Sequence, residues 1–400
     1  MRSRSCQIVP EVLNREWRWI HLIRVGVLVS AVTSHMALSA DLIVSGIEGV
    51  HVWLSQPGGK LVRKQSLSNV PYNAGGVLAD LNGDNNLDWF GVTVNPTPHQ
   101  VWFGRGDGSF VRGKQIFGGK HASWGVAAAD IDRDGDIDVL VPTPVGSGRC
   151  PPSELWMNNG RGKFNLGQLL DIGCSRSAVF ADVNGDGSVD IISADTSIVG
   201  EQPTGPSSNR IWLNNGHGHF RDSGQRFSNA ASYGVASADL DGDGRVDLVF
   251  ANQGHQSVYF NRGNGIFEES TQLIGDFSAF AVAVGDLDGN GSADLVFAAA
   301  DNSGSRVWLN DGHAHFHELD QRLGSGSALD VILVDFDQDG DLDVVLSNRN
   351  MATEEEIGGI FIWLNDGAAH LSPSGIKLDS GHFRKAVSGS LRSILVGSVN

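Results

Sequence analysis

The sequence has few of the features that mark a helical, membrane-spanning or nucleic-acid-binding protein. Of its 400 residues, 19% are charged and 12 are proline, whereas 52 are glycine, and no helical or heptad period runs through it. Frequent turns between short β-forming segments predict an all-β fold. The formal net charge of −17 argues against a nucleic-acid backbone or an anionic membrane surface as a partner, because both are negatively charged.

The chain also lacks a long hydrophobic run. The best candidate near the start, residues 25–32, follows three arginines and precedes small residues that end at Ala40. This run is too short to span a bilayer, which takes about 20 apolar residues, so the pattern predicts a secretory signal peptide over residues 1–40. A signal anchor that stays attached is the alternative. After cleavage we expect no transmembrane segment and an exported protein, whether secreted, periplasmic or on the cell surface.

What the chain has in abundance is a repeat. Six acidic nonapeptides read DLNGDNNLD, DIDRDGDID, DVNGDGSVD, DLDGDGRVD, DLDGNGSAD and DFDQDGDLD. Seven aromatic segments of the type VWLNDGHAHF alternate with them, and their aromatic residues are Trp53, Trp102, Trp156, Trp212, Tyr259, Trp308 and Trp363. These residues recur at intervals of 47 to 56 residues, a period typical of β-propeller blades. Their regular phase predicts that the rings pack between sheets.

Each repeat contains four short β-forming segments. In one copy they are residues 233–238, 248–251, 257–260 and a segment that begins at Phe267. Seven such units predict a single domain over residues 41–400, a seven-bladed β-propeller of four-stranded antiparallel blades. The segment after residue 40 lacks a first strand, and residues 383–387 near the C-terminus have the character of one. The two ends are therefore expected to share one blade, and whether residues 393–397 add a strand there stays open.

The loop pattern D-x-[DN]-x-[DN]-G-x-x-D before a β-strand, together with the arm W-[LFM]-N-x-G-x-G-x-F, resembles the FG-GAP/VCBS repeat. That repeat builds the propeller of integrin α-subunits and occurs in many exported bacterial proteins and some fungal lectins. The resemblance covers residues 41–400. It implies a seven-bladed propeller with calcium-binding loops and a binding or adhesion function.

The acidic loops have the chemistry of a calcium site, since Ca²⁺ takes about six to eight oxygen ligands and a short loop of alternating carboxylates can wrap it. We expect up to six Ca²⁺ ions, held by the side chains at positions 1, 3, 5 and 9 and a backbone carbonyl at position 7. The side chains are Asp80, Asn82, Asp84 and Asp88; Asp130, Asp132, Asp134 and Asp138; Asp182, Asn184, Asp186 and Asp190; Asp239, Asp241, Asp243 and Asp247; Asp286, Asp288, Asn290 and Asp294; and Asp335, Asp337, Asp339 and Asp343. The carbonyls belong to Asn86, Asp136, Ser188, Arg245, Ser292 and Asp341.

Two loops depart from the pattern. Asn290 leaves its loop one charge short, which predicts weaker binding. Asn85 replaces the central glycine of the first loop, and that site is retained because Asn tolerates the left-handed conformation. The alternative reading, acidic turns without a metal, must explain why the six loops hold 23 of the 46 carboxylates, since clustered carboxylates repel unless they are neutralised.

The predicted topology places the expected ligand. In a four-stranded blade, the turns between strands one and two and between strands three and four share one face, and the other connections share the opposite face. The long insertions at residues 142–153, 195–209 and 348–359 fall on the face opposite the calcium loops, where we expect a glycan or protein ligand. Residues that precede a first strand lie near this face: Tyr72, His121, Trp124, Tyr233, Phe280 and Phe383.

Only three cysteines are present, and Cys6 lies in the predicted signal peptide. Cys150 lies in one of the insertions and Cys174 in the connection to the next blade, so both are expected on the same face. An exported protein permits one disulfide between them, and their predicted proximity satisfies the distance that a disulfide requires.

No catalytic or cofactor-binding motif stands out, so we expect a binding or adhesion module and not an enzyme. An extracellular polysaccharide-active enzyme with its site in the mouth of the propeller is the first alternative, and a purely structural module is the second. Two or three inward-pointing carboxylates at the mouth would favour the enzyme.

Overall fold

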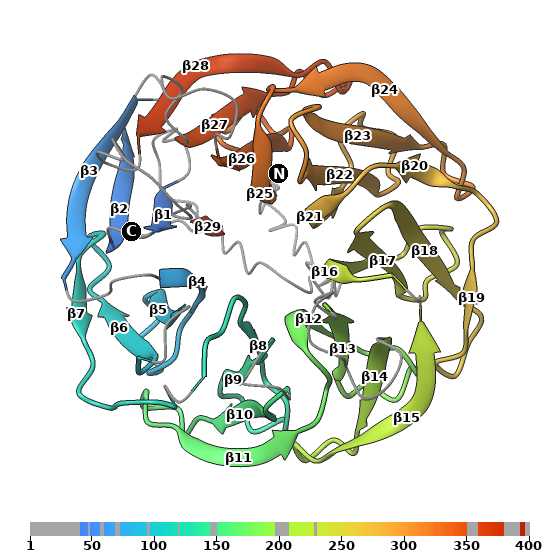
Figure 1. The fold of residues 1–400 in the computed structure, drawn as a ribbon. Coiled ribbons are helices and arrows are strands. Elements are labelled where there is room, and N and C mark those ends of the chain that lie inside the picture. Colours follow the sequence, from blue (N-terminus) through green and yellow to red (C-terminus); the bar gives the residue numbers. More distant parts are fainter. Residues whose placement is uncertain are drawn as a thin grey trace, which may run out of the picture.

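The computed structural model describes residues 41–46, 49–56, 60–68, 73–93, 97–118, 121–144, 150–196, 208–227, 230–349, 359–379 and 393–396. Within them, seven antiparallel sheets stand radially around one central axis (Figure 1). This is an all-β seven-bladed propeller, as the repeat predicts. The expected signal peptide, Tyr72 and residues 383–387 lie outside the described residues.

Six blades are formed by consecutive strands, with the first strand nearest the axis and the last at the rim (Figure 1). The first three are β4 (Asn73–Ala79), β5 (Asp88–Thr93), β6 (Gln100–Gly104) and β7 (Phe110–Arg112); β8 (Ala127–Ala129), β9 (Asp138–Val141), β10 (Ser153–Met157) and β11 (Asn165–Leu170); and β12 (Ser175–Ala181), β13 (Asp190–Asp195), β14 (Asn209–Asn214) and β15 (Phe220–Phe227). The next three are β16 (Ser232–Ala238), β17 (Asp247–Asn252), β18 (His255–Asn261), β19 (Phe267–Glu269) and β20 (Ile274–Asp276); β21 (Ala279–Gly285), β22 (Asp294–Ala299), β23 (Ser305–Asn310) and β24 (Phe316–Leu323); and β25 (Ser327–Val334), β26 (Asp343–Arg349), β27 (Gly359–Leu364) and β28 (Ser372–Asp379).

The seventh blade joins the two ends of the described chain. It consists of β29 (Ser393–Val396), β1 (Leu42–Gly46), β2 (Gly49–Gln56) and β3 (Lys60–Leu67), in that order from the axis. Leu42 pairs with Val396 across the junction. The expectation of a shared blade is confirmed, and the question left open by the sequence is answered, because residues 393–396 supply the innermost strand.

The four-strand reading of the repeat around Asp239 agrees with β16 to β19. The structure adds β20, a short strand that also pairs with β18. The rim strand of this blade is therefore split in two, with β19 pairing with one end of β18 and β20 with the other.

The hydrophobic core lies between neighbouring blades. One cluster joins Val179, Ile192 and Ile211 of the β12–β15 blade to Leu248 and Phe250 of the next. The arm residues take part in this packing as expected: Trp102, Trp156, Tyr259 and Trp308 are buried, and Trp53, Trp212 and Trp363 are half-buried. Each blade thus depends on its neighbours for burial of its apolar surface.

A glutamine near the rim of a blade bonds to the backbone of the next blade. The side chain of Gln168 donates to Phe220 O at 2.9 Å and accepts from Phe220 N at 2.9 Å. This contact was not predicted from the sequence, although glutamines recur in phase. The same two-bond contact is made by Gln65, Gln115 and Gln272, and a single donated bond by Gln225 and Gln321.

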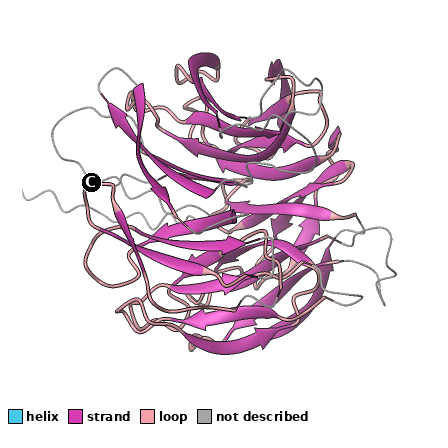
Figure 2. Ribbon diagram, turned by 60° about the vertical axis from the view of Figure 1, so that its left-hand side comes forward, coloured by secondary structure: helices cyan, strands magenta, loops and turns pink. Residues whose placement is uncertain are grey.

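The described residues form strands and loops (Figure 2), and no helix among them is long and apolar enough to cross a membrane. The disulfide between Cys150 and Cys174 links adjacent blades, with 5.0 Å between the two Cα atoms. Cys150 comes just before β10 and Cys174 just before β12. The insertion side of one blade thus adjoins the connection that leads into the next, in agreement with the predicted faces.

Candidate metal centres and an interblade cavity

Every acidic nonapeptide connects the innermost strand of a blade to its second strand. Position 1 directly follows the inner strand, and position 9 is the first residue of the next one, as with Ala79 at the end of β4 and Asp88 at the start of β5. The six loops therefore occupy equivalent places in six blades. The turns between third and fourth strands lie beside them, since Gly162 N donates to Leu81 O of the preceding blade at 2.7 Å.

The carboxylate at position 1 accepts hydrogen bonds from the backbone of its own loop. Asp239 Oδ1 accepts hydrogen bonds from the backbone N–H groups of Gly242 and Asp243 at 2.8 and 3.1 Å, and its Oδ2 accepts from Gly244 N at 2.8 Å. Equivalent sets surround Asp80, Asp182 and Asp286. Such side-chain-to-backbone bonds favour a tight turn over a regular strand.

The turn demands a left-handed backbone at position 6. Five loops place glycine there, and Asn85 of the first loop adopts the same conformation with φ of 66°, as expected from its tolerance of that region. Position 4 also requires a left-handed backbone, which was not predicted from the sequence. Arg133 and Gln338 occupy it with φ of 65° and 64°, where the other four loops have glycine.

In all six loops, the side-chain oxygen at position 5 accepts a hydrogen bond from the backbone N–H group at position 7. Asp243 Oδ1, for example, accepts a hydrogen bond from Arg245 N at 2.9 Å. The other five pairs have N···O distances of 2.7 to 3.0 Å. The position 7 carbonyls remain predicted ligands.

The aspartate at position 9 is buried in every loop. Asp138 accepts from Ile131 N at 3.3 Å with one oxygen and from Asn158 N at 2.7 Å with the other. Burial raises the pKa of Asp138 to about 7, and the two backbone hydrogen bonds act in the opposite direction. Burial likewise raises the pKa of Asp88, Asp190 and Asp247 to about 7 and of Asp294 and Asp343 to about 6.

Four of the six loops bring three carboxylates together, each offering an oxygen within 4.8 Å of the others. Three of these groups combine positions 1, 3 and 9, and the loop at Asp335 combines positions 1, 3 and 5. The groups are Asp130, Asp132 and Asp138; Asp239, Asp241 and Asp247; Asp286, Asp288 and Asp294; and Asp335, Asp337 and Asp339. The remaining predicted side-chain ligands of these loops, Asp134, Asp243, Asn290 and Asp343, are not part of the groups.

The other two loops have asparagine at position 3. In the loop at Asp182, the amide of Asn184 donates to Asp186 Oδ2 at 2.9 Å, and its oxygen accepts from Asp186 N at 2.8 Å. In the loop at Asp80, Asn82 Oδ1 accepts from Asp84 N at 3.0 Å. These loops offer three carboxylates instead of four, and the structure does not bring the three together as closely as in the other loops.

Several carboxylate oxygens in these loops are buried and have no hydrogen-bond donor in the described part of the chain. They are Oδ1 of Asp130, Asp132, Asp241 and Asp335. A buried anionic oxygen without a partner is costly, and the groups that compensate it are donors or cations. The donor set is all oxygen, which suits a hard divalent cation. The aspartate clusters could therefore hold metal ions.

One candidate centre already contains cationic side chains of the protein. Arg245 is ion-paired with Asp243, and Arg262 Nη1 lies 3.1 Å from Asp241 Oδ2. Position 3 and position 5 of the loop at Asp239 are thus partly neutralised by arginine. A metal ion at this loop would compete with both arginines for the same oxygens.

The arm asparagine positions the metal loops. Asn158 donates from its side-chain amide to Ile137 O of its own blade at 3.0 Å and to Leu81 O of the preceding blade at 2.9 Å. This contact between blades was not predicted from the sequence. Equivalent pairs of bonds are made by Asn214, Asn261, Asn310 and Asn365.

The loops, the arms and their recurrence match a known repeat. The family described as the FG-GAP-like repeat matches residues 80–141, 182–250, 239–297 and 286–346. The chain belongs to the FG-GAP-like repeat family. Each matched segment begins at position 1 of an acidic loop, so the candidate metal centres open the FG-GAP-like repeats of this propeller.

Solved propellers share the fold of these FG-GAP-like repeats at low sequence identity. A lectin from Agrocybe aegerita that specifically recognises non-reducing terminal N-acetylglucosamine is 21% identical, with a TM-score of 0.55 over 84% of this chain and 89% of that one. A periplasmic gluconolactonase from Pseudomonas aeruginosa is 10% identical with a TM-score of 0.58 over 91% and 100% of the two chains. These likenesses concern the fold alone. A search among curated proteins found no match.

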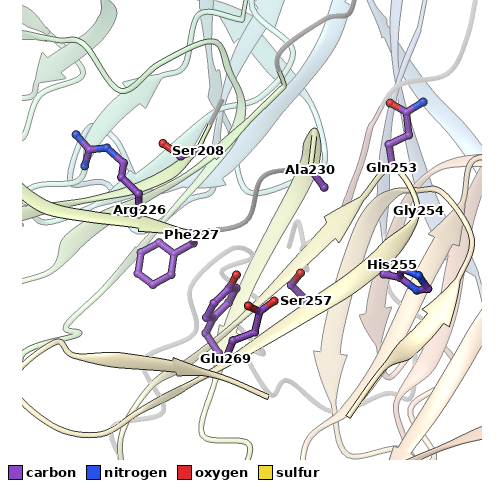
Figure 3. A pocket seen from close by; sticks show the side chains of 10 residues that line it. Ser208, Arg226, Phe227, Ala230, Gln253, Gly254, His255, Ser257 and Glu269 are labelled. Carbon is purple, nitrogen blue, oxygen red and sulfur yellow. The ribbon is translucent and has the colours of Figure 1, made fainter. Parts of the chain in front are cut away.

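A cavity of about 590 Å³ lies between the β12–β15 and β16–β20 blades of the FG-GAP-like propeller (Figure 3). Ser208 borders it at the end of the insertion that precedes β14, and Gln253 and His255 border it from the turn between β17 and β18. Both connections run between second and third strands. The cavity therefore opens on the side of the long insertions, opposite the acidic loops.

The lining of the cavity combines aromatic and polar groups. Phe227 and Glu269 approach its middle in Figure 3, with Arg226 and His255 toward its ends. Asp222 holds Arg226 by two hydrogen bonds of 2.8 and 2.6 Å. This cavity was not predicted from the sequence, because its walls come from two different repeats.

Proposed function

We propose that the protein is an exported, calcium-dependent glycan-binding module. The observation that carries the proposal is the interblade cavity, which offers aromatic surface together with hydroxyl, imidazole, carboxylate and guanidinium groups. Sugars bind in concave sites where apolar faces and a few fixed polar groups coincide. The acidic loops on the opposite face leave this side of the scaffold available for a ligand.

Calcium is the metal that suits the acidic loops best, because their donors are carboxylate, amide and carbonyl oxygens. The ligands would come from positions 1, 3, 5 and 9 with the carbonyl at position 7. A bound ion would neutralise carboxylates that otherwise repel one another. It would also tie the innermost strand of a blade to the second strand, and so stiffen the blades that form the cavity.

Two further observations support export and sugar binding. A disulfide such as Cys150–Cys174 persists in oxidising compartments outside the cytosol, in keeping with the predicted signal peptide. The similar propeller from Agrocybe aegerita is a lectin. For this reason glycans, and not proteins, are the first ligand class to test.

The experiment is a glycan array probed with the purified mature chain, once with 1 mM CaCl₂ and once with EGTA. We expect calcium-dependent binding of defined glycans that falls at least about tenfold in His255→Ala, whose imidazole borders the cavity. The matched control is His313→Ala, an exposed histidine in a turn between β23 and β24 on the opposite face. Binding that is absent in calcium, or lost equally in both variants, would refute the assignment.

An enzyme is the alternative from another class, and the gluconolactonase of similar fold is a reason to test it. Incubating the chain with the same glycans and with sugar lactones, followed by chromatography of the products, separates the two. Turnover would establish an enzyme, whereas binding without turnover supports the module.

A further inference from the structure

Four aligned residues from four consecutive blades meet near the axis of the propeller. They occupy the position six residues before the first aspartate of each acidic loop, and they are Trp124, Arg176, Tyr233 and Phe280. Trp124 precedes the innermost strand β8, and the other three lie in the innermost strands β12, β16 and β21 (Figure 1). Because each acidic loop follows the other end of its strand, these four residues lie toward the insertion face.

Three aromatic rings surround one guanidinium. The Cζ atom of Arg176 lies 4.6 Å from the ring centroid of Trp124, 5.0 Å from that of Phe280 and 5.3 Å from that of Tyr233. The rings of Tyr233 and Phe280 contact each other edge to face, with centroids 5.2 Å apart. The four side chains therefore form one cluster, which we call the arginine–aromatic cluster.

Glycine allows the strands to approach this closely. A Cβ on Gly125, next to Trp124, would lie 2.6 Å from the carbonyl oxygen of Arg176. A side chain at that position would push the two blades apart and move the indole away from the guanidinium. The cluster is thus built into the backbone and does not depend on side-chain rotamers alone.

The guanidinium of Arg176 is half-buried and charged, yet the described residues give it no hydrogen-bond acceptor. Burial lowers its pKa to about 10, which leaves it protonated at neutral pH. Aromatic faces attract the charge, but they accept none of the five N–H donors of an arginine. The charge of Asp330 in β25 raises the pKa of Arg176, and no hydrogen bond joins the two side chains.

Arg306 shows the usual arrangement by contrast. It also stacks on a ring, with its Cζ atom 4.2 Å from the centroid of Phe277, but its guanidinium donates to Glu318 at 3.2 Å. An arginine that is held flat by rings and keeps its donors available can pair with a planar oxyanion through two parallel hydrogen bonds.

We propose that the arginine–aromatic cluster binds the carboxylate of an acidic sugar, such as a uronic acid residue within a glycan. Arg176 would pair with the carboxylate, and the rings of Trp124, Tyr233 and Phe280 would contact the apolar faces of the sugar. The proposal rests on the glycan-binding function and adds a substrate class to it. The protein has a formal net charge of −17, so it would repel a polyanionic glycan that carries one charge on every unit and lies along its surface. A glycan with a single carboxylate meets less of this repulsion.

The test is titration calorimetry on the full mature chain in 1 mM CaCl₂. The ligands are a glycan that ends in one galacturonic acid residue and the same glycan with galactose in its place. We expect Arg176→Gln to weaken binding of the acidic glycan at least about tenfold and to leave binding of the neutral glycan within about twofold. Arg63→Gln is the matched control, since Arg63 is an exposed residue of the rim strand β3 whose Cζ atom lies 5.9 Å from the ring centroid of Trp53 in β2.

Arg176→Lys serves as a second variant that keeps the positive charge among the rings. It should also weaken binding of the acidic glycan several-fold, because an ammonium group lacks the planar pair of donors. If Arg176→Gln does not fold, this variant decides the matter by itself. Unchanged affinity of the acidic glycan in either folded variant would overturn the proposal.

The outcomes separate this proposal from the one on which it rests. Tight binding of the acidic glycan that depends on Arg176 supports both. Binding of neutral glycans without any preference for the acidic one overturns the role of the arginine–aromatic cluster and leaves the glycan-binding function standing. Binding of neither ligand, together with an empty glycan array, overturns both.

Discussion

The side-chain amide of Asn214 donates a hydrogen bond of 2.8 Å to the carbonyl oxygen of Ile131, 83 residues earlier in the chain. The same amide donates to Val189 O of its own blade at 3.0 Å. Ile131 is the second residue of an acidic loop, so one side chain connects two neighbouring candidate metal loops. Equivalent bonds in four more blades repeat this arrangement, so the six blades that carry acidic loops are joined in one series of contacts.

Replacing Asn214 by alanine should lower the free energy of unfolding by about 2–4 kcal/mol, because two buried carbonyls lose their donor. Urea denaturation measures the change. Asn215→Ala is the control: its side chain is exposed and its oxygen accepts only within its own turn, so it should cost less than about 1 kcal/mol. Equal losses in the two variants would show that the interblade bonds contribute nothing.

Removal of calcium should destabilise the whole propeller. With a dissociation constant near ~0.1 mM, 1 mM Ca²⁺ contributes about 1.4 kcal/mol per site, or about 8 kcal/mol for six independent sites. EGTA should therefore lower the melting temperature by many degrees, and magnesium should restore it poorly. A melting curve indifferent to chelation would disprove the calcium assignment.

The loop at Asp239 should bind its ion more tightly when Arg262 is neutralised. Arg262→Gln removes the cation that lies 3.1 Å from Asp241, and removing such a competitor should raise the affinity of that loop about three- to tenfold. Native mass spectrometry at limiting calcium would show a higher mean occupancy than in Arg221→Gln, an exposed arginine of β15. Asp243→Ala in the same loop should lower the maximum count by one ion.

The disulfide should stabilise the protein and report on export. Cys150 and Cys174 lie 24 positions apart in the sequence, and a loop of that length corresponds to about 3 kcal/mol in the chain-entropy model. The variant with serine at both positions should lose about that much in urea denaturation. Thiol labelling of the denatured, unreduced protein should find neither cysteine free, and two labelled thiols would contradict the prediction.

His99 should make stability fall in mild acid. It is buried, and burial lowers its pKa to about 4, below the usual value near 6.5. The contribution of neutral His99 to the free energy of unfolding is therefore fully present above about pH 6.5 and is lost as the pH falls toward 4. Between pH 7.5 and 5 the loss should be about 2 kcal/mol. The difference in unfolding free energy between the chain and His99→Gln, in saturating calcium, should shrink by that amount. A difference that does not change with pH would contradict the shift.

Local sequence patterns determined much of this protein. Alternating aspartates, glycines and short β-forming runs specify turns and strands through contacts within a few residues, so the six acidic loops and four strands per blade could be predicted. The left-handed conformation of Asn85 follows from the same local chemistry. Seven repeats of similar length leave few arrangements other than a closed ring.

The tertiary structure decided what depends on contacts between repeats. Closure selected residues 393–396 as the innermost strand of the shared blade, and it placed Asn214 against Ile131 across 83 residues. It also gathered Trp124, Arg176, Tyr233 and Phe280 from four blades around one guanidinium. No local sequence pattern predicts such contacts. The partners are about 50 residues or more apart in the sequence, and the distance between their side chains is fixed only when the blades pack against one another and the ring closes.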